Sequence, residues 1–293
     1  MKTYLDCIPC FLTQSLEAAR MTGVDKKVQE KVLKKVMNYL ETVDFDSSPP
    51  EISREVHHII RKTTGSKDPY KKVKEHSNKM AEKEYDHLKK LVKEDEDPLL
   101  MSVKLAIVGN VVDFGTSNRF ELEKMIDKAT GKDFVDDAYP RFKEVVDKSS
   151  NILYLADNAG EVFFDKILIE EIKNLYPKKK IFYVVRQNPI INDVTIEDAE
   201  YAEVDKLAEI IYGDKNQDIS APGFVLKYTS DEFQKLLKNS DMVISKGQGN
   251  YESLSDIKRE VFFLLMVKCP LVSREINIDV ANLVLKRQKK LND

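Results

Sequence analysis

The sequence predicts an α/β protein with a mostly parallel central sheet, helices on both faces of that sheet and an all-helical N-terminal cap. Apolar residues recur at helical spacing through the first 95 residues, whereas short apolar runs rich in β-branched residues appear after residue 150. Helical patterns separate several of these runs, and such alternation is typical of a parallel sheet. We therefore expect a helical cap at 1–95 and an α/β core at 96–293.

The N-terminal cap is expected to contain four helices. The first begins at a Cys-x-x-Cys motif, Cys7 to Cys10, because Pro9 suits the first turn of a helix. The second and third cover 25–43 and 51–62. The fourth runs from Asp68-Pro69-Tyr70 to about residue 94, with Asp68 as the expected N-cap. These helices have little apolar mass of their own, so we expect them to pack onto the core.

Residues 98–114 are apolar on nearly every side, which predicts a helix that is buried all round. Its end contains Asn110 and Asp113, which need partners because an unpaired buried polar group costs roughly 1–3 kcal/mol. They either satisfy each other and the nearby backbone or face a site. Two more helices are expected at 120–129 and 134–146.

The core pattern predicts five strands with helices between several of them. The expected strands are 152–155, 181–185, 210–212, 242–245 and 262–267. Helices are expected at 162–175 and 231–238.

The composition excludes several classes of protein. The chain has 293 residues, of which 42% are hydrophobic, enough for a sizeable core. A net charge of −3 provides no basic field for nucleic acid. No run reaches the ~18 apolar residues of a membrane span, and no signal-peptide pattern opens the chain, so we expect a cytoplasmic protein without a membrane partner. Three cysteines, an odd number, argue against a disulfide framework.

Three polar clusters follow predicted strands. They are Asp157-Asn158-Ala159-Gly160-Glu161, the segment 186–193 from Arg186 to Asp193, and the segment 246–252 from Lys246 to Glu252. Each cluster alone is compatible with an ordinary turn and helix cap. The carboxyl ends of parallel strands share one edge of a sheet, where open α/β sheets bind their ligands. We therefore expect the three clusters to converge on one site.

The residue types in these clusters point to phosphate chemistry with a metal ion. Asp157, Asn158 and Asp193 supply hard oxygen ligands that suit Mg²⁺ or Mn²⁺. Lys246 can neutralise phosphate charge, and the amides near Gly247 can add hydrogen-bond donors. Such a set favours phosphoryl transfer to water. Arg186 either meets the phosphate or pairs with a carboxylate.

Taken together, these segments resemble the damage-control phosphatases, a metal-dependent family formerly grouped as a domain of unknown function and also linked to an acidic-residue methyltransferase label. The matching segments run in family order from residue 7 to residue 252 and so cover most of the chain. They are Cys7-x-x-Cys10, Asp68-Pro69-Tyr70, Gly109-Asn110-x-x-Asp113-Phe114-Gly115, Asp157-Asn158-Ala159-Gly160-Glu161, Asn192-Asp193 and Lys246-Gly247-Gln248-Gly249-Asn250-Tyr251-Glu252. The Cys-x-x-Cys motif is similar to that of a subgroup found in archaea and some bacteria.

The resemblance implies one divalent metal ion (Mn, Ni, Co or Mg) held by residues matching Asp157, Asn158 and Asp193. It also implies a phosphate-binding lysine matching Lys246 and a substrate contact matching Glu161. We add Asn110 as a substrate contact oriented by Asp113. Further substrate contacts are expected from Gly247, Gln248, Asn250 and Arg186. Another branch of the family carries an Arg-Thr-x-Lys element; the comparable segment here reads Val267-Lys268-Cys269-Pro270, so Lys268 receives no role.

The sequence hypothesis is a divalent-metal-dependent phosphatase that hydrolyses small phosphorylated metabolites, such as sugar phosphates or damaged nucleotides. Attack by water is favoured over transient phosphorylation of Asp157, because a carboxylate that binds a metal is a weakened nucleophile. An S-adenosylmethionine-dependent carboxyl methyltransferase ranks lower, since the loop after the first strand has one glycine, Gly160. A non-catalytic metal or nucleotide sensor is the third alternative. For Cys7 and Cys10, a redox role, a packing or substrate-lining role and a zinc-binding role all stay open.

Overall fold

The N-terminal region is all-helical, as predicted. The computed structural model describes residues 1–110, 124, 126–127, 134–135, 138–215 and 218–289. The first helices are α1 (Cys7–Met21), α2 (Lys26–Leu40), α3 (Pro49–Thr64), α4 (Lys71–Glu94) and α5 (Pro98–Gly109). The predicted start of α4 is wrong: Asp68 is not its N-cap but accepts a hydrogen bond from the Tyr70 amide at 3.0 Å, and the helix begins at Lys71.

The core is a seven-stranded sheet in the order β1-β7-β6-β5-β2-β3-β4. All neighbouring strands are parallel except β6 and β7. The strands are β1 (Phe134–Val135), β2 (Asn151–Leu155), β3 (Lys180–Val185), β4 (Glu209–Tyr212), β5 (Met242–Lys246), β6 (Val261–Met266) and β7 (Leu283–Gln288). The five predicted strands are confirmed. The helix predicted at 134–146 is wrong at its start, because 134–135 forms β1 and helix α7 covers Tyr139–Lys148.

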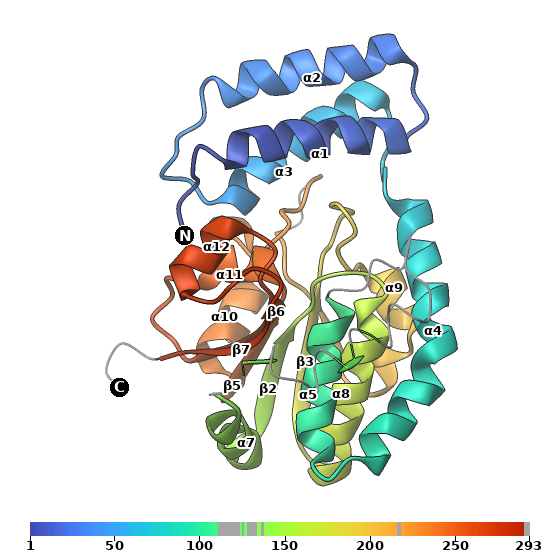
Figure 1. The fold of residues 1–293 in the computed structure, drawn as a ribbon, viewed down its shortest axis with the longest axis vertical. Coiled ribbons are helices and arrows are strands. Elements are labelled where there is room, and N and C mark those ends of the chain that lie inside the picture. Colours follow the sequence, from blue (N-terminus) through green and yellow to red (C-terminus); the bar gives the residue numbers. More distant parts are fainter. Residues whose placement is uncertain (111–123, 125, 128–133, 136–137, 216–217, 290–293) are drawn as a thin grey trace.

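Helices cover both faces of the sheet (Figure 1). Side chains of successive strand residues point to opposite faces: in β2, Ile152 and Tyr154 join one buried cluster, and Leu153 and Leu155 join another. The first cluster includes residues of α4, α5, α7, α8 (Glu161–Leu175) and α9 (Ile196–Tyr201). The second includes residues of α10 (Asp231–Asn239), α11 (Gln248–Leu254) and α12 (Pro270–Ile276). Two short 3-10 helices cover Val204–Lys206 and Leu226–Tyr228.

Helices α1, α2 and α3, which we call the three-helix unit, have a hydrophobic cluster of their own. Leu271 of α12 belongs to the same cluster, so the unit packs onto the α/β core beside α12. Helix α4 differs, because Ala81, Leu88 and Val92 are buried in the main core with α5 and α8. Figure 1 shows the three-helix unit across one end of the sheet and α4 running down its side. The boundary near residue 95 stays a prediction.

The strand order places a topological switch point between β2 and β5. From β2 the chain continues outward through β3 and β4 on one side, and β5, β6 and β7 lie on the other. Ligands of open α/β sheets bind at the carboxyl ends of the strands where the order reverses. Asp157 follows β2 and Gly247 follows β5, so the fold brings two of the three predicted clusters to this point. Within the described residues, no helix has the length and apolar character needed to cross a membrane.

Candidate metal and phosphate site

The segments that contain Asp157 and Asp193 are paired through their main chains. The Val194 amide donates to the Asp157 carbonyl at 2.9 Å, and the Ala159 amide donates to the Asn192 carbonyl at 2.8 Å. Asn158 and Asp193 form an antiparallel bridge between these two bonds. The three expected metal ligands therefore lie together, although 36 residues separate Asp157 from Asp193 in the chain (193 − 157).

Two asparagine side chains connect the carboxylates of Asp157 and Glu161. Asn110 Nδ2 donates to Asp157 Oδ2 at 2.6 Å and to Glu161 Oε1 at 2.7 Å. Asn158 Nδ2 donates to the same two oxygens at 2.8 and 2.6 Å. The amide nitrogen of Asn158 is thus bound by protein, which leaves its oxygen, the atom that asparagine offers a metal, for other contacts.

Gly247 provides the space that the Asp157 carboxylate occupies. A Cβ at Gly247 would lie 1.9 Å from Asp157 Oδ2, far inside van der Waals contact. Its φ of +78° is also one that side-chain-bearing residues rarely adopt. Gly247 therefore allows the Asp157 carboxylate to lie against its backbone. This role differs from the predicted role of Gly247 as a substrate contact.

Burial and like charge raise the pKa of both aspartates. Desolvation is the main cause of the well-raised pKa of Asp157, and the charges of Glu161 and Asp193 add to it, whereas Lys268 and Lys246 oppose it. Desolvation also raises the pKa of Asp193 to about 6, although Arg186 opposes the shift through its charge and a hydrogen bond from Nε to Asp193 Oδ2 at 2.8 Å. Crowded carboxylates of this kind are characteristic of functional sites and suit a cation between them.

Lys246 is fully buried and its ammonium is bound by two carboxylates. Nζ lies 3.0 Å from Glu161 Oε2 and 2.6 Å from Asp165 Oδ1. Asp165 also accepts the hydroxyls of Tyr154 and Tyr183, at 2.6 and 2.8 Å. Lys246 thus lies behind Glu161, on the side of α8. Its expected contact with phosphate, like that of Glu161 with substrate, stays a prediction.

Arg186 and Asn250 are also buried, and their hydrogen bonds connect the segments that follow β2, β3 and β5. Arg186 Nη2 donates to Asn250 Oδ1 at 3.0 Å, and the guanidinium carbon lies 3.6 Å from the centre of the Phe224 ring. Asn250 Nδ2 donates to the carbonyls of Ala156 and Lys246, at 3.0 and 2.8 Å. Of the two roles open to Arg186, the structure shows the ion pair with a carboxylate.

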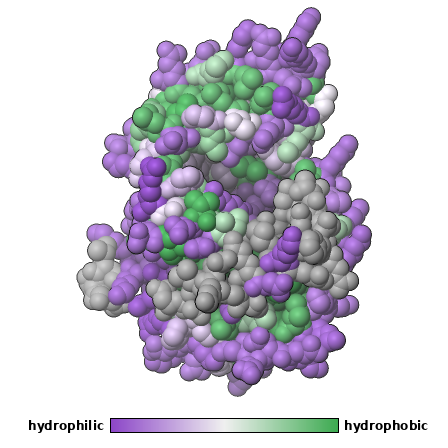
Figure 2. Space-filling view, viewed as in Figure 1, coloured by the Kyte–Doolittle hydropathy of each residue, from purple (hydrophilic) through white to green (hydrophobic). Residues whose placement is uncertain are grey.

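A cavity of about 560 Å³ opens between the sheet edge and the three-helix unit. Figure 2 shows the hollow between the upper helical part and the α/β part. Asp157, Asn158, Asp193 and Gln248 line it, whereas Lys246, Glu161, Arg186, Asn110 and Asn250 are not among the lining residues in the described chain. Asp113 lies outside the described residues.

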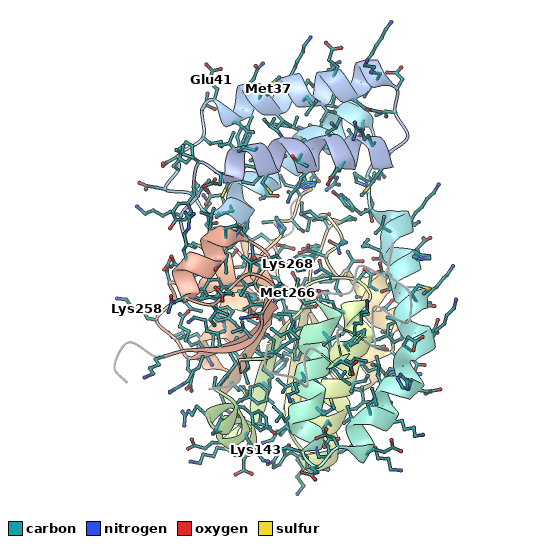
Figure 3. All side chains as sticks on the ribbon, in the orientation of Figure 1. Met37, Glu41, Lys143, Lys258, Met266 and Lys268 are labelled. Atoms are coloured by element: carbon teal, nitrogen blue, oxygen red, sulfur yellow. The ribbon has the colours of Figure 1, made fainter. Side chains whose placement is uncertain are left out.

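Lys268 lines this cavity, although the sequence motifs assign it no role. It is exposed at the end of β6, beneath the three-helix unit (Figure 3), and its charge lowers the pKa of Asp157. Glu252 lines the cavity as well, and desolvation raises its pKa to about 7 against the opposing hydrogen bond from Gln248. The signal for Lys268 was present in the sequence, since it follows a predicted strand at the same edge.

The donor set fits a hard divalent cation. It consists of two carboxylates and one amide, and hard divalent cations accept oxygen atoms of both kinds as ligands. Within the described residues, no three His, Cys, Asp or Glu side chains gather as a metal cluster, so a role for the Asn158 oxygen as the third ligand stays a prediction. The buried oxygen of Asn110 has no hydrogen-bond partner in the described part of the chain, and its amide nitrogen contacts Asp157. An unfilled acceptor beside crowded carboxylates suits a bound ion or its water.

A family model described as the damage-control phosphatase ARMT1-like domain matches residues 3–284. The chain belongs to this phosphatase family. A damage-control phosphatase of Pyrococcus horikoshii is 34% identical over 99% of both chains, and one of Archaeoglobus fulgidus is 32% identical over 96% of this chain and 97% of the relative. A crystal structure of a P. horikoshii protein, described as a DUF89 family protein, superposes with a TM-score of 0.89 at 33% identity and covers 99% of this chain and 100% of that one.

Membership of the damage-control phosphatase family confirms the resemblance seen in the motifs. It favours a phosphatase over the S-adenosylmethionine-dependent alternative, because the two curated relatives are named as phosphatases. A phosphorylated compound is accordingly the expected substrate.

Proposed function

We propose that this protein is a divalent-metal-dependent phosphatase that hydrolyses small phosphorylated metabolites as a form of metabolite damage control. The observation that carries the proposal is the meeting of Asp157, Asn158 and Asp193 at the switch point of the sheet, where all three line one cavity. Desolvation, with the charges of neighbouring carboxylates in addition, raises the pKa values of Asp157 and Asp193, and a cation between them would stabilise their ionised forms.

Asp157, Asn158 and Asp193 would hold the ion, Mn²⁺, Ni²⁺, Co²⁺ or Mg²⁺, through their side-chain oxygens. When bound, such an ion draws electron density from the phosphate and makes water a better nucleophile. Asn110 and Asn158 hold the Asp157 and Glu161 carboxylates in fixed positions. Lys246 balances the charge of Glu161 and does not itself line the cavity of the described chain.

The cavity wall supplies groups for the phosphate and for protons. Lys268 presents an exposed ammonium that suits a phosphate oxygen. Glu252, with a pKa of about 7, can hold or release a proton at neutral pH. The cavity volume of about 560 Å³ lies within the roughly 300–1,000 Å³ of small-molecule sites, which suits sugar phosphates or nucleotides rather than phosphoproteins.

The proposal is tested by hydrolysis of an aryl phosphate after chelation and again after addition of Mn²⁺, Co²⁺, Ni²⁺ or Mg²⁺. We expect turnover to vanish on chelation and to return with at least one ion. Asp157→Ala should abolish both the turnover and the bound metal. Metal-independent turnover, or an Asp157→Ala variant that retains the metal content of the unaltered protein, contradicts the proposal. Stoichiometric metal binding without turnover of any of a panel of metabolite phosphates would support the sensor alternative.

A matched pair of lysine variants locates the phosphate-binding cation. Lys268→Met should raise the KM for the aryl phosphate and lower kcat/KM by about 10–100-fold, the loss of one charge-assisted contact. The melting temperature should stay unchanged, because the side chain is exposed. The opposite result is unaltered kinetics for Lys268→Met together with a loss of phosphate affinity in a folded Lys246→Met variant. It would identify Lys246 as the phosphate-binding cation, as the sequence predicts.

A further inference from the structure

Helix α4 reaches the neighbourhood of the candidate metal site through the buried side chain of Asn78. This residue is 5% exposed and lies in the first half of the helix, and its side chain hydrogen-bonds the turn after β2 and the start of α9. Neither the motifs nor the family resemblance draws attention to it. Its two hydrogen bonds, however, reach the two chain segments that provide the expected metal ligands.

The first bond fixes the turn after β2. Asn78 Oδ1 accepts the Gly160 amide at 2.7 Å. Gly160 is the N-cap of α8, and its φ of +82° is accessible to few other residues. Because Asp157 and Asn158 precede Gly160 by three and two residues, the position of this amide determines how the turn presents their side chains. A buried amide without an acceptor would favour relaxation of the turn.

The second bond fixes the segment that contains Asp193. Asn78 Nδ2 donates to Asp198 Oδ1 at 2.8 Å. The other carboxylate oxygen of Asp198 accepts the Thr195 amide at 2.9 Å and the Thr195 hydroxyl at 2.8 Å, which forms a capping box at the start of α9. Thr195 lies two residues after Asp193. Asn78 therefore connects both ligand-bearing segments to one rigid helix.

Lys74 completes the network one turn earlier on α4. Its ammonium lies 3.2 Å from Asp68 Oδ2 and 3.5 Å from Asp198 Oδ2, and its side chain is buried. Lys74 balances the charge of Asp198, the side chain that accepts hydrogen bonds from both Asn78 and Thr195. The amide of Asn78 is the member of the network that also reaches Gly160.

We propose that Asn78 is a positioning residue of the metal site, which holds the paired Asp157-Asn158 turn and Asp193 segment in place by bridging Gly160 to Asp198. The proposal rests on the proposed function, since it concerns the affinity for the divalent ion. Groups that orient metal ligands typically change metal affinity by 10–100-fold when they are removed. A residue with a purely structural role would change the melting temperature and leave that affinity alone.

The test measures Mn²⁺ affinity by titration calorimetry on the full chain at neutral pH. Asn78→Asp retains the acceptor for Gly160 but sets a carboxylate against Asp198, and it should weaken Mn²⁺ binding by about 10-fold or more. The double variant Asn78→Asp with Asp198→Asn exchanges donor and acceptor while conserving the charge. It should recover the affinity of the unaltered protein to within about 3-fold, because the bridge re-forms.

The matched control is Leu88→Ala on the same helix. Leu88 is fully buried in the main core, and no hydrogen bond links it to the site. Its removal should lower the melting temperature and leave Mn²⁺ affinity unchanged. In the phosphatase assay, Asn78→Asp should lose turnover at limiting Mn²⁺ and regain it at saturating Mn²⁺, with the KM for aryl phosphate changed by less than about 2-fold.

The outcomes separate the two proposals. If the unaltered protein binds no divalent ion, the proposed function and the role of Asn78 both fail. If it binds Mn²⁺ but Asn78→Asp has the same affinity, or the double variant is no better than the single one, the positioning role alone is overturned. Should Asn78→Asp fail to fold, Asn78→Ser removes the bridge without adding charge and takes its place, with an affinity loss expected again and an unchanged affinity overturning the role.

Discussion

The two walls of the cavity are built in different ways. The wall at the sheet edge holds its polar side chains in place with other polar side chains, so that Asp157, Asp193 and Glu161 each have an assigned partner. The wall formed by the three-helix unit is mostly thiols and apolar groups, with two neutral polar side chains among them; its residues are Cys7, Cys10, Phe11, Gln14, Pro49, Pro50 and Ser53. From this difference we expect the chemistry at the sheet edge, and we expect the three-helix unit mainly to shape the cavity.

The largest loss of stability is expected when the buried Lys246 is replaced. Lys246→Met leaves Glu161 and Asp165 as buried carboxylates without their cation, which should cost about 3–5 kcal/mol of unfolding free energy. Urea unfolding monitored by circular dichroism measures the loss. Lys34→Met, which removes an exposed ion pair with Glu30 in the three-helix unit, is the control and should leave the unfolding free energy nearly unchanged. Equal losses would mean that the buried charges at the sheet edge stabilise the fold no more than an exposed ion pair of the three-helix unit does.

The second prediction concerns pH and the three-helix unit. His57 of α3 is 3% exposed, and desolvation, aided by the charge of Arg61, lowers its pKa to about 4. Because the unfolded chain takes up this proton near pH 6.5 and the folded chain does not, stability should fall as the pH drops from about 6.5 to 4, by about 3 kcal/mol in total. His57→Gln should flatten this part of the pH profile of the unfolding free energy, whereas His76→Gln on the surface of α4 should not. A profile that His57→Gln leaves unchanged would show that the pKa of His57 is the same in the folded and the unfolded protein.

The third prediction compares two glycines with similar backbone angles. Gly247 has φ +78° and Gly65, at the end of α3, has φ +75°. A Cβ at Gly247 would meet the Asp157 carboxylate, whereas one at Gly65 would meet nothing within 4 Å. Gly247→Ala should therefore lower phosphatase activity by about 100-fold through displacement of Asp157. Gly65→Ala should cost about 1 kcal/mol in backbone strain and leave activity intact. Similar activities for the two variants would contradict the close approach of Gly247 to Asp157.

The smallest effect is expected at Cys10. The thiol lies on the cavity wall of the three-helix unit, and desolvation raises its pKa, so it is a weak nucleophile at neutral pH. Cys10→Ser should change kcat/KM by less than about 2-fold, equivalent to under 0.5 kcal/mol. Alkylation of Cys10 with a bulky maleimide should instead block the cavity, measured against an equally treated Cys10→Ser control. A large loss in Cys10→Ser itself would give the three-helix unit a chemical role.

The sequence was sufficient to locate the strands whose side chains are buried on both faces of the sheet. Continuous apolar runs such as 152–155 and 262–267 have few alternative structures, because they must be covered on both sides. Strand β7 was not predicted, because the second half of the strand is polar: Lys286, Arg287 and Gln288. Its position in the sheet depends on antiparallel pairing with β6. Strand β1 has two residues and exists through its pairing with β7.

The convergence of Asp157, Asn158 and Asp193 was predictable from the sequence alone, since polar residues after parallel strands share one edge. Which lysine faces the cavity was decided by the tertiary structure. Both Lys246 and Lys268 follow apolar runs, but the first is the last residue of a strand and points to Asp165 of α8, whereas the second lies beyond its strand and is free of that helix. Asn78 has no local signal at all, because its partners lie 82 and 120 residues away. Local pattern determines the edge on which polar groups meet, and only packing between distant elements determines which of them reach the substrate and which hold the others in place.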